Sequence, residues 1–284
     1  MLIRPLPLLN FFVAMVMFSI GLRVSGGELI GVVRNRALLT RALLVNCVLI
    51  PALGFLLVHS FPLKPDVSVG ILLLAAIPGT PIALQFTRQA KTRLAFAAAM
   101  TFVLSLVSLA MTPLAIGIMP QTMRHNQRPM LDLIVSIVFY IGLPLCAGLW
   151  LARRAPKIAP RLVLPLGILA TIVFVFLMWE TRLVRREAIK AISGSGTILA
   201  MLLLLSISML LGWVCGGPDS ESRRVLATAS GMRSVIVVLY IARFCFPGTG
   251  VYMVPIAYLS IMVPTNLLFH LAFAGWHKWQ SRPA

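Results

Sequence analysis

Long runs of apolar residues alternate with short basic or turn-forming segments along the chain. An α-helix needs about 20 apolar residues to cross the ~30 Å hydrocarbon core of a bilayer. The first run lacks a small-residue cleavage site and continues into Gly21, Leu22 and Arg23, so we interpret it as a membrane span and not as a signal peptide. The pattern predicts an all-α polytopic membrane protein with nine spans: 5–24, 37–59, 67–89, 94–119, 130–151, 160–180, 195–215, 222–243 and 251–274.

The amino-acid composition also excludes several classes of protein. The 284 residues are 60% hydrophobic and 11% charged, against about 25% charged in soluble domains. These values exclude a soluble enzyme, a disordered chain and a secreted disulfide scaffold. The net charge of +18 comes from basic clusters between the apolar runs, which is typical of a membrane protein and not of a nucleic-acid-binding face. The four cysteines form no CxxC motif, so we expect no metal or redox site.

The basic residues also predict an orientation. The segments that follow spans 1, 3, 5, 7 and 9 hold fifteen Lys and Arg residues, and the opposite side holds nine. Because cytoplasmic loops carry the excess of Lys and Arg, we expect the N-terminus outside and the C-terminus in the cytoplasm. We therefore expect a multi-pass protein of the plasma (inner) membrane, in contact with the lipid bilayer.

Span 67–89 carries Pro78, Gly79, Thr80 and Pro81 at its centre. Proline removes a backbone donor and clashes with the preceding helical turn. Each half of about ten residues would cover about 15 Å, half of the bilayer. A simple proline kink is the alternative, but two prolines around a glycine favour a real interruption.

Span 222–243 contains a second interruption, with Ser230, Gly231, Arg233 and Ser234 inside an apolar run. An arginine at that depth costs at least ~3 kcal/mol and usually faces a cavity or a partner. All seven acidic residues lie in loops or at span ends, so no intramembrane carboxylate is available to pair with Arg233. We interpret it as an anion-binding cation; a structural arginine bonded to backbone carbonyls is the alternative.

The two interrupted spans are the third and the eighth, so they cross the membrane in opposite directions. Spans 6–9 therefore resemble an inverted copy of spans 1–4, with span 5 as the extra element. We expect one transporter domain over 1–284, a truncated first repeat over 1–120 and a second over 130–276. Interrupted helices at matching positions of inverted halves indicate a transporter's substrate site, and half-helix N-termini favour an anionic substrate.

Polar residues inside other spans complete the candidate site. Thr101, Ser105, Ser108 and Thr112 are spaced to share one helix face; they either line the site or aid close packing of helices. A buried amide such as Asn46 or Asn266 either joins helices or contacts the substrate. The candidate substrate-binding residues are Arg233, Ser230, Ser234, Thr80, Asn46, Thr101, Ser105 and Asn266. We expect no catalytic residue, metal ligand or cofactor.

Several motifs make the chain similar to the bile acid:sodium symporter family. They are Pro78-Gly79-Thr80, Met111-Thr112-Pro113-Leu114, Gly231-Met232-Arg233-Ser234, Ile241-Ala242-Arg243-Phe244, and Asn46 five residues before Pro51. The resemblance implies a panel domain of spans 1, 5 and 6 and a core domain of spans 2–4 and 7–9. In the core the two broken helices would cross, and movement of core against panel would provide alternating access.

The chain departs from that family at most of the positions that the resemblance assigns to sodium ligands. Such ligands are kept at Asn46 and Thr101. They are replaced at Ala83, Leu84, Ala97, Ala229, Arg233 and Ser234. The resemblance therefore implies transport of an organic anion without the usual sodium ions, and the coupling ion stays open between Na⁺, H⁺ and none.

The pattern as a whole predicts a secondary transporter of a small amphipathic organic anion. An exporter resembling auxin carriers or arsenite permeases is one alternative, and a transport-inactive membrane sensor or binding subunit of the same fold is another. An enzyme is disfavoured because the apolar spans hold no carboxylate and the four histidines are scattered along the chain.

Overall fold

A computed structural model describes residues 6–23, 26–79, 94–118, 135–136, 138–180, 182–194 and 196–280, and every regular element in these ranges is helical. The first half of the chain contains α1 (Leu6–Arg23), α2 (Gly26–Arg34), α3 (Arg36–Leu44), η1 (Val45–Leu49), α4 (Ile50–Ser60), α5 (Pro65–Ala76), α7 (Leu94–Ile118) and η3 (Val138–Gly142). The second half contains α9 (Leu143–Arg154), α10 (Ala159–Glu180), α11 (Arg182–Ile192), α12 (Thr197–Cys215), α13 (Ser220–Gly231), α14 (Val235–Cys245), η4 (Gly250–Tyr252) and α15 (Met253–Gln280).

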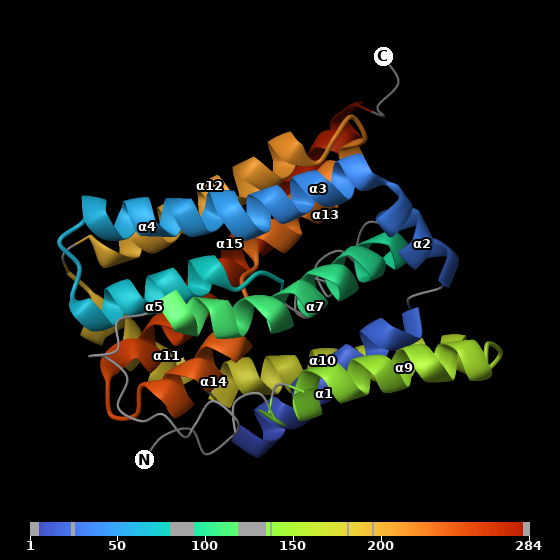
Figure 1. Cartoon of the computed structure of the whole chain (residues 1–284), viewed down its shortest axis with the longest axis horizontal. Helices are drawn as coiled ribbons and strands as arrows, with labels where there is room; N and C mark the ends of the chain where they lie inside the picture. The colour runs from blue at the N-terminus through green and yellow to red at the C-terminus, as the bar shows by residue number, and fades with distance from the viewer. Residues whose placement is uncertain are drawn as a thin grey trace.

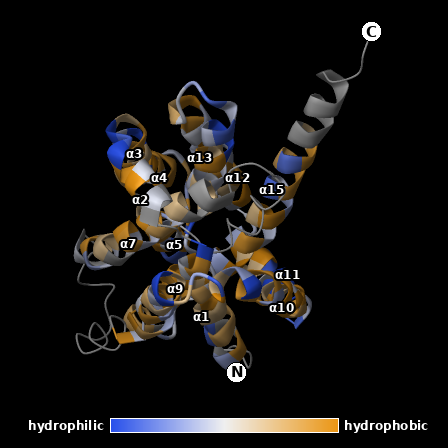
Figure 2. Ribbon diagram, turned by 90° about the vertical axis from the view of Figure 1, so that its right-hand side faces the viewer, coloured by the Kyte–Doolittle hydropathy of each residue, from blue (hydrophilic) through white to orange (hydrophobic). Residues whose placement is uncertain are grey.

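Most of the longer helices lie side by side along the long axis of the molecule (Figure 1). Seen end on, their outer sides are predominantly hydrophobic (Figure 2), and many large apolar side chains, such as Phe55, Phe139 and Trp150, are exposed there. Soluble proteins rarely expose so much continuous apolar surface. In lipid such a surface is favourable, and a helix forms its own backbone hydrogen bonds there. The predicted all-α membrane protein is therefore confirmed.

Among the residues that the structure describes, five helical segments are long and apolar enough to cross a membrane. They are Arg36–Ser60, Ala159–Glu180, Thr197–Cys215, Ser220–Ala242 and Gly250–Ala272. Shorter apolar helices cover Asn10–Arg23, Pro65–Ala76 and Ala99–Ala115. The spans predicted at 67–89 and 130–151 lie partly outside the described residues, so the count of nine stays a prediction.

The connection between the spans predicted at 160–180 and 195–215 contains the amphipathic helix α11. Arg182, Arg186 and Lys190 form part of its exposed basic side, whereas Ala188 and Ile192 are buried. Charged residues at helical spacing form a stable helix when one face packs against protein. Here α11 packs against α15.

Helix α1 packs closely against both α9 and α10 on one side of the bundle (Figure 1). Gly21 of α1 and Gly148 of α9 allow the closest approach, because a Cβ at either position would collide with the backbone of the other helix. These three helices lie within spans 1, 5 and 6, the set that the resemblance assigned to a panel domain.

The interrupted helix α13–α14 is the most enclosed of the five candidate spans in the described residues. Its most apolar stretch is 94% buried inside the protein, whereas α10 is 17% buried by the same measure. Helix α12 packs along α13, and α5 and α15 contact α14. Arg233 and Tyr258 are the largest of the fully buried side chains. A polar centre therefore lies in the interior of an otherwise apolar bundle.

Candidate functional site where α5 ends beside the interruption of α13–α14

The end of α5 meets the interruption between α13 and α14, at a place that we call the crossing. Helix α5 ends at Ala76 and α13 ends at Gly231, and the backbone N–H of Ser234 donates to the carbonyl oxygen of Ile77 at 3.5 Å. At the other end, the Asp66 carboxylate at the start of α5 accepts a 2.8 Å hydrogen bond from the N–H of Gly250, beyond the end of α14. The start of one helix lies beside the end of the other, so they run in opposite directions.

Local chemistry explains where the first helix stops. Ile77 has extended backbone angles and Pro78 supplies no N–H, so the helical ladder cannot continue. Gly79 follows with φ +72°, a left-handed conformation that favours glycine, and its backbone lies against that of Leu104. Thr80 and Pro81, which the sequence placed in the same interruption, lie outside the described residues.

The second interruption begins at Met232, where ψ of 97° ends the helix. The carbonyl of Gly231 would be left without a partner there, and the buried Tyr258 hydroxyl of α15 donates to it at 3.0 Å. Ser234, which is buried, immediately precedes the new helix α14. Tyr258 was not among the sequence candidates, and a tyrosine inside an apolar run was the only available signal.

Arg233 is completely buried between the two interruptions. Its Nε donates to the carbonyl of Leu74 at 2.9 Å, its Nη2 donates to the carbonyl of Ala75, and its Nη1 donates to Oδ1 of Asn46 at 2.9 Å. The guanidinium therefore bonds mainly to backbone carbonyls, which is the alternative that the sequence left open. Every one of its three nitrogens already donates to a protein oxygen.

Asn46 connects three elements around that arginine. The π-helical turn η1 places it inside the bundle, where its Nδ2 donates to the Ala42 carbonyl at 3.0 Å and to the Ser230 hydroxyl at 3.1 Å. Its Oδ1 meanwhile accepts from Arg233. Two predicted site residues, Asn46 and Ser230, thus lie in one buried network with Arg233. The Asn46 amide joins helices, which is one of the two roles that the sequence left open for it.

The hydroxyl residues on one face of α7 differ in whether they have a hydrogen-bond partner. The Thr101 hydroxyl donates to the Ala97 carbonyl, and the Thr112 hydroxyl donates to the Ser108 carbonyl, each at 2.8 Å. By contrast, the hydroxyl oxygens of Ser105 and Ser108 are buried and have no hydrogen-bond partner among the described residues. Helical spacing alone cannot separate these two pairs, because all four residues share one face.

Both serines line a small cavity next to the crossing. Its other walls come from Gly79 at the first interruption, Ser234 just before α14, Val237 of α14, Met17 of α1 and Ile141 of η3. The volume is about 10 Å³, enough for about one water molecule. The cavity therefore lies where both interruptions, α7 and the α1–α9 side of the bundle converge.

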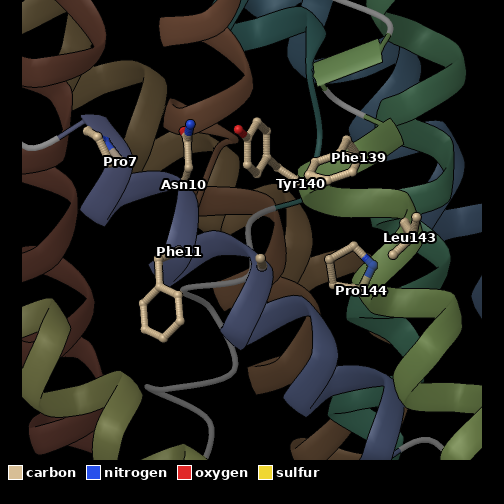
Figure 3. Close-up of a pocket in the computed structure, with 8 residues that line it drawn as sticks. Pro7, Asn10, Phe11, Phe139, Tyr140, Leu143 and Pro144 are labelled. Atoms are coloured by element: carbon tan, nitrogen blue, oxygen red, sulfur yellow. The ribbon is translucent and has the colours of Figure 1, made fainter.

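A larger cavity of about 470 Å³ lies nearer the start of α1. Figure 3 shows Asn10 of α1 and Tyr140 of η3 facing each other across it. The Tyr240 hydroxyl of α14 donates to Oδ1 of Asn10, and the rings of Tyr240 and Tyr140 stack with centroids 6.3 Å apart. Asn10, Tyr140 and Tyr240 were not among the site candidates predicted from the sequence.

Asn266 of α15 is fully buried, but no described hydrogen bond joins it to the crossing. Its Nδ2 donates to the Met262 carbonyl of its own helix at 2.9 Å, and its Oδ1 has no partner in the described part of the chain. Among the same residues, no three His, Cys, Asp or Glu side chains come together as metal ligands.

The fold and the crossing define a class of protein: an all-helical integral membrane protein whose polar centre lies where α5 ends beside the interruption of α13–α14. The model of the sodium bile acid symporter family matches residues 10–192, more than half of the chain. The chain therefore belongs to the sodium bile acid symporter family, whose members are transporters and not enzymes.

Two curated relatives extend this finding at low identity. A "Sodium-dependent organic anion transporter" of Bos taurus is 26% identical over 161 residues, which are 56% of this chain and 42% of the bovine protein. An "Uncharacterized sodium-dependent transporter YocS" of Bacillus subtilis (strain 168) is 23% identical over 231 residues, 80% of this chain and 70% of that protein. The chain thus spans less than half of the bovine relative's length.

Proposed function

We propose that this protein is a secondary transporter of a small amphipathic organic anion and binds the anionic group at the crossing of the interrupted helices. The observation that carries the proposal is the pair of unpartnered buried hydroxyls, Ser105 and Ser108, facing the beginning of α14 across one cavity. Buried polar groups are nearly always hydrogen-bonded. Two free hydroxyls beside a helix N-terminus are what a carboxylate or sulfonate would use.

The beginning of α14 supplies the complementary charge. The first N–H groups of a helix have no intrahelical partner and carry the positive end of the helix dipole, so helix N-termini bind anions. Ser234 and Val237 of this first turn line the cavity opposite Ser105 and Ser108. Serine hydroxyls donate to an anion without adding charge, so these groups together favour a single anionic head group.

The two cavities form one route in the proposal. Asn10, Ala14 and Met17 follow one face of α1 from the larger cavity to the smaller one. Tyr240 and Val237 follow α14 in the same direction. The larger cavity has the volume of a small-ligand site, whereas the smaller holds about one water, so the crossing is closed in this state.

The contacts of Tyr240 separate the two cavities in the proposed cycle. Its hydrogen bond to Asn10 and its stacking on Tyr140 join α14 to α1 and η3. Movement of α14 and the rest of the core against α1, α9 and α10 would break these contacts and admit the anion. We propose this movement as the alternating-access step, with the N-terminus outside, inverted repeats over 1–120 and 130–276, and the larger cavity facing outward.

The test is binding and flux on the same protein. Purified protein is screened by thermal unfolding with bile salts, small carboxylates and sulfonates, and each stabilising anion is then assayed for uptake into proteoliposomes. We expect at least one anion to raise the unfolding temperature and to be transported. Stabilisation without uptake would instead identify a transport-inactive sensor, and no stabilisation by any anion would refute the proposed site.

A further inference from the structure

We propose that the Arg233 guanidinium is a built-in cation that occupies an oxygen-lined cation site between the interrupted helices, so that the protein carries its anion without sodium. The inference rests on the proposed function only for the nature of the cargo. The oxygen atoms that accept hydrogen bonds from Arg233, which we call the cage, are arranged in the same way whatever is transported.

The cage is formed from oxygen atoms that a helix end leaves without partners. The last four carbonyls of a helix accept no intrahelical hydrogen bond and carry the negative end of its dipole. Because α5 stops at Ala76, the carbonyls of Leu74 and Ala75 are free to bind a cation, and both accept from Arg233. Asn46 adds a third oxygen at 2.9 Å from Nη1.

The acceptor set identifies the kind of ligand that it suits. Carbonyl and amide oxygens with no carboxylate are ligands for a hard monovalent cation or a guanidinium. The three oxygens come from two separate elements, α5 and η1, and converge on one side chain that is 0% exposed. Arginine does not lose its proton in proteins, so the positive charge of the cage is permanent.

A free sodium ion does not fit this arrangement. It would need the oxygens that already accept from Arg233, and it would have to displace a covalently attached guanidinium. Even beside the cage, the fixed positive charge would repel a second cation across a low-dielectric interior. The charge that a bound ion would bring to the crossing is instead supplied one residue before Ser234, which lines the proposed anion cavity.

The first test compares salts on the unmodified protein. Unfolding temperature and uptake of a stabilising anion are measured in sodium chloride and in choline chloride. We expect the unfolding temperatures to agree and the uptake rates to agree within about twofold. A requirement for sodium in uptake, or stabilisation by sodium without added anion, would overturn the proposal. If no anion is taken up in either salt, the proposed function fails while the unfolding comparison still decides the role of the cage.

The second test empties the cage and refills it. Arg233→Ala should lower the unfolding temperature and abolish uptake, and millimolar guanidinium should restore both in part, with a rise of about 2 °C or more. Arg185→Ala is the matched control, because Arg185 also donates to a backbone carbonyl, that of Met178, but lies on α11 away from the crossing. An Arg233→Ala protein as stable as the unmodified one, or equal rescue of both variants, would contradict a specific cation cage.

If Arg233→Ala does not fold, Arg233→Lys provides the same comparison. Lysine keeps the charge but cannot reproduce three separately directed donors. We expect this variant to be less stable than the unmodified protein and to gain nothing from sodium. A lysine variant that becomes sodium-dependent would show that the cage admits the ion beside a fixed charge, which the proposal excludes.

Discussion

Replacing Ser105 or Ser108 by alanine should affect stability and binding in opposite directions. Each hydroxyl is buried without a described partner, and an unsatisfied buried polar group costs about 1–3 kcal/mol. Alanine removes that cost and adds no volume. We therefore expect the unfolding temperature without ligand to stay the same or to rise by about 2–4 °C for each kcal/mol recovered.

The same substitutions should weaken anion binding. A hydrogen bond to a charged group contributes about 1.5–3 kcal/mol, so losing one raises Kd by about 10- to 150-fold. Thermal unfolding measures stability, and isothermal titration with the most stabilising anion measures Kd. Thr101→Val is the matched control, because that hydroxyl is already bonded to the Ala97 carbonyl, and its Kd should not change.

Two results would refute this reasoning. A Ser108→Ala protein that unfolds at a clearly lower temperature without ligand would mean that the hydroxyl has a structural partner. Unchanged Kd in both serine variants would mean that the anion does not reach this cavity, whatever its effect on the rest of the protein.

Three further substitutions and one labelling experiment test other parts of the structure. Gly79→Ala should lower stability by about 1–3 kcal/mol, because φ is +72° and the new Cβ would lie 3.0 Å from Leu104; thermal unfolding measures this loss. Tyr258→Phe should cost about 1 kcal/mol by the same measurement, since the Gly231 carbonyl loses its donor. Tyr240→Phe should open the closing contact more often, which thiol labelling of a cysteine at Met17, in the smaller cavity, detects as a rate about 2- to 10-fold higher. A cysteine in 155–158 should be labelled only from the cytoplasmic side, and labelling from outside would reverse the proposed orientation.

The interruptions themselves were predictable from the sequence, because proline and glycine act on the backbone locally. Pro78 and Gly79 lie where α5 stops, and Gly231 is the last residue of α13. Arg233 was also recognisable, since a charge inside an apolar run is costly anywhere in a bilayer. The positions of the interruptions and of the buried arginine could therefore be predicted without knowledge of the fold.

The partners of Arg233 were not predictable in the same way. Its acceptors at Leu74 and Ala75 lie more than 150 residues away in the chain, and they become available only because another helix ends beside it. The sequence shows no signal for a carbonyl that will lack a partner. The same limit explains why the free hydroxyls of Ser105 and Ser108 could not be told from the bonded one of Thr101.

Carrying an anion past a fixed Arg233, without a co-transported cation, has an electrical consequence. If this guanidinium stays in place while a monovalent anion crosses without sodium, each cycle moves one net negative charge through the membrane field. A potential of 100 mV, negative inside, then changes the equilibrium anion gradient about fiftyfold and favours outward movement. The direction of net transport would be set by the membrane voltage, or by a second anion returning in exchange, and current recording on a planar bilayer would distinguish the two.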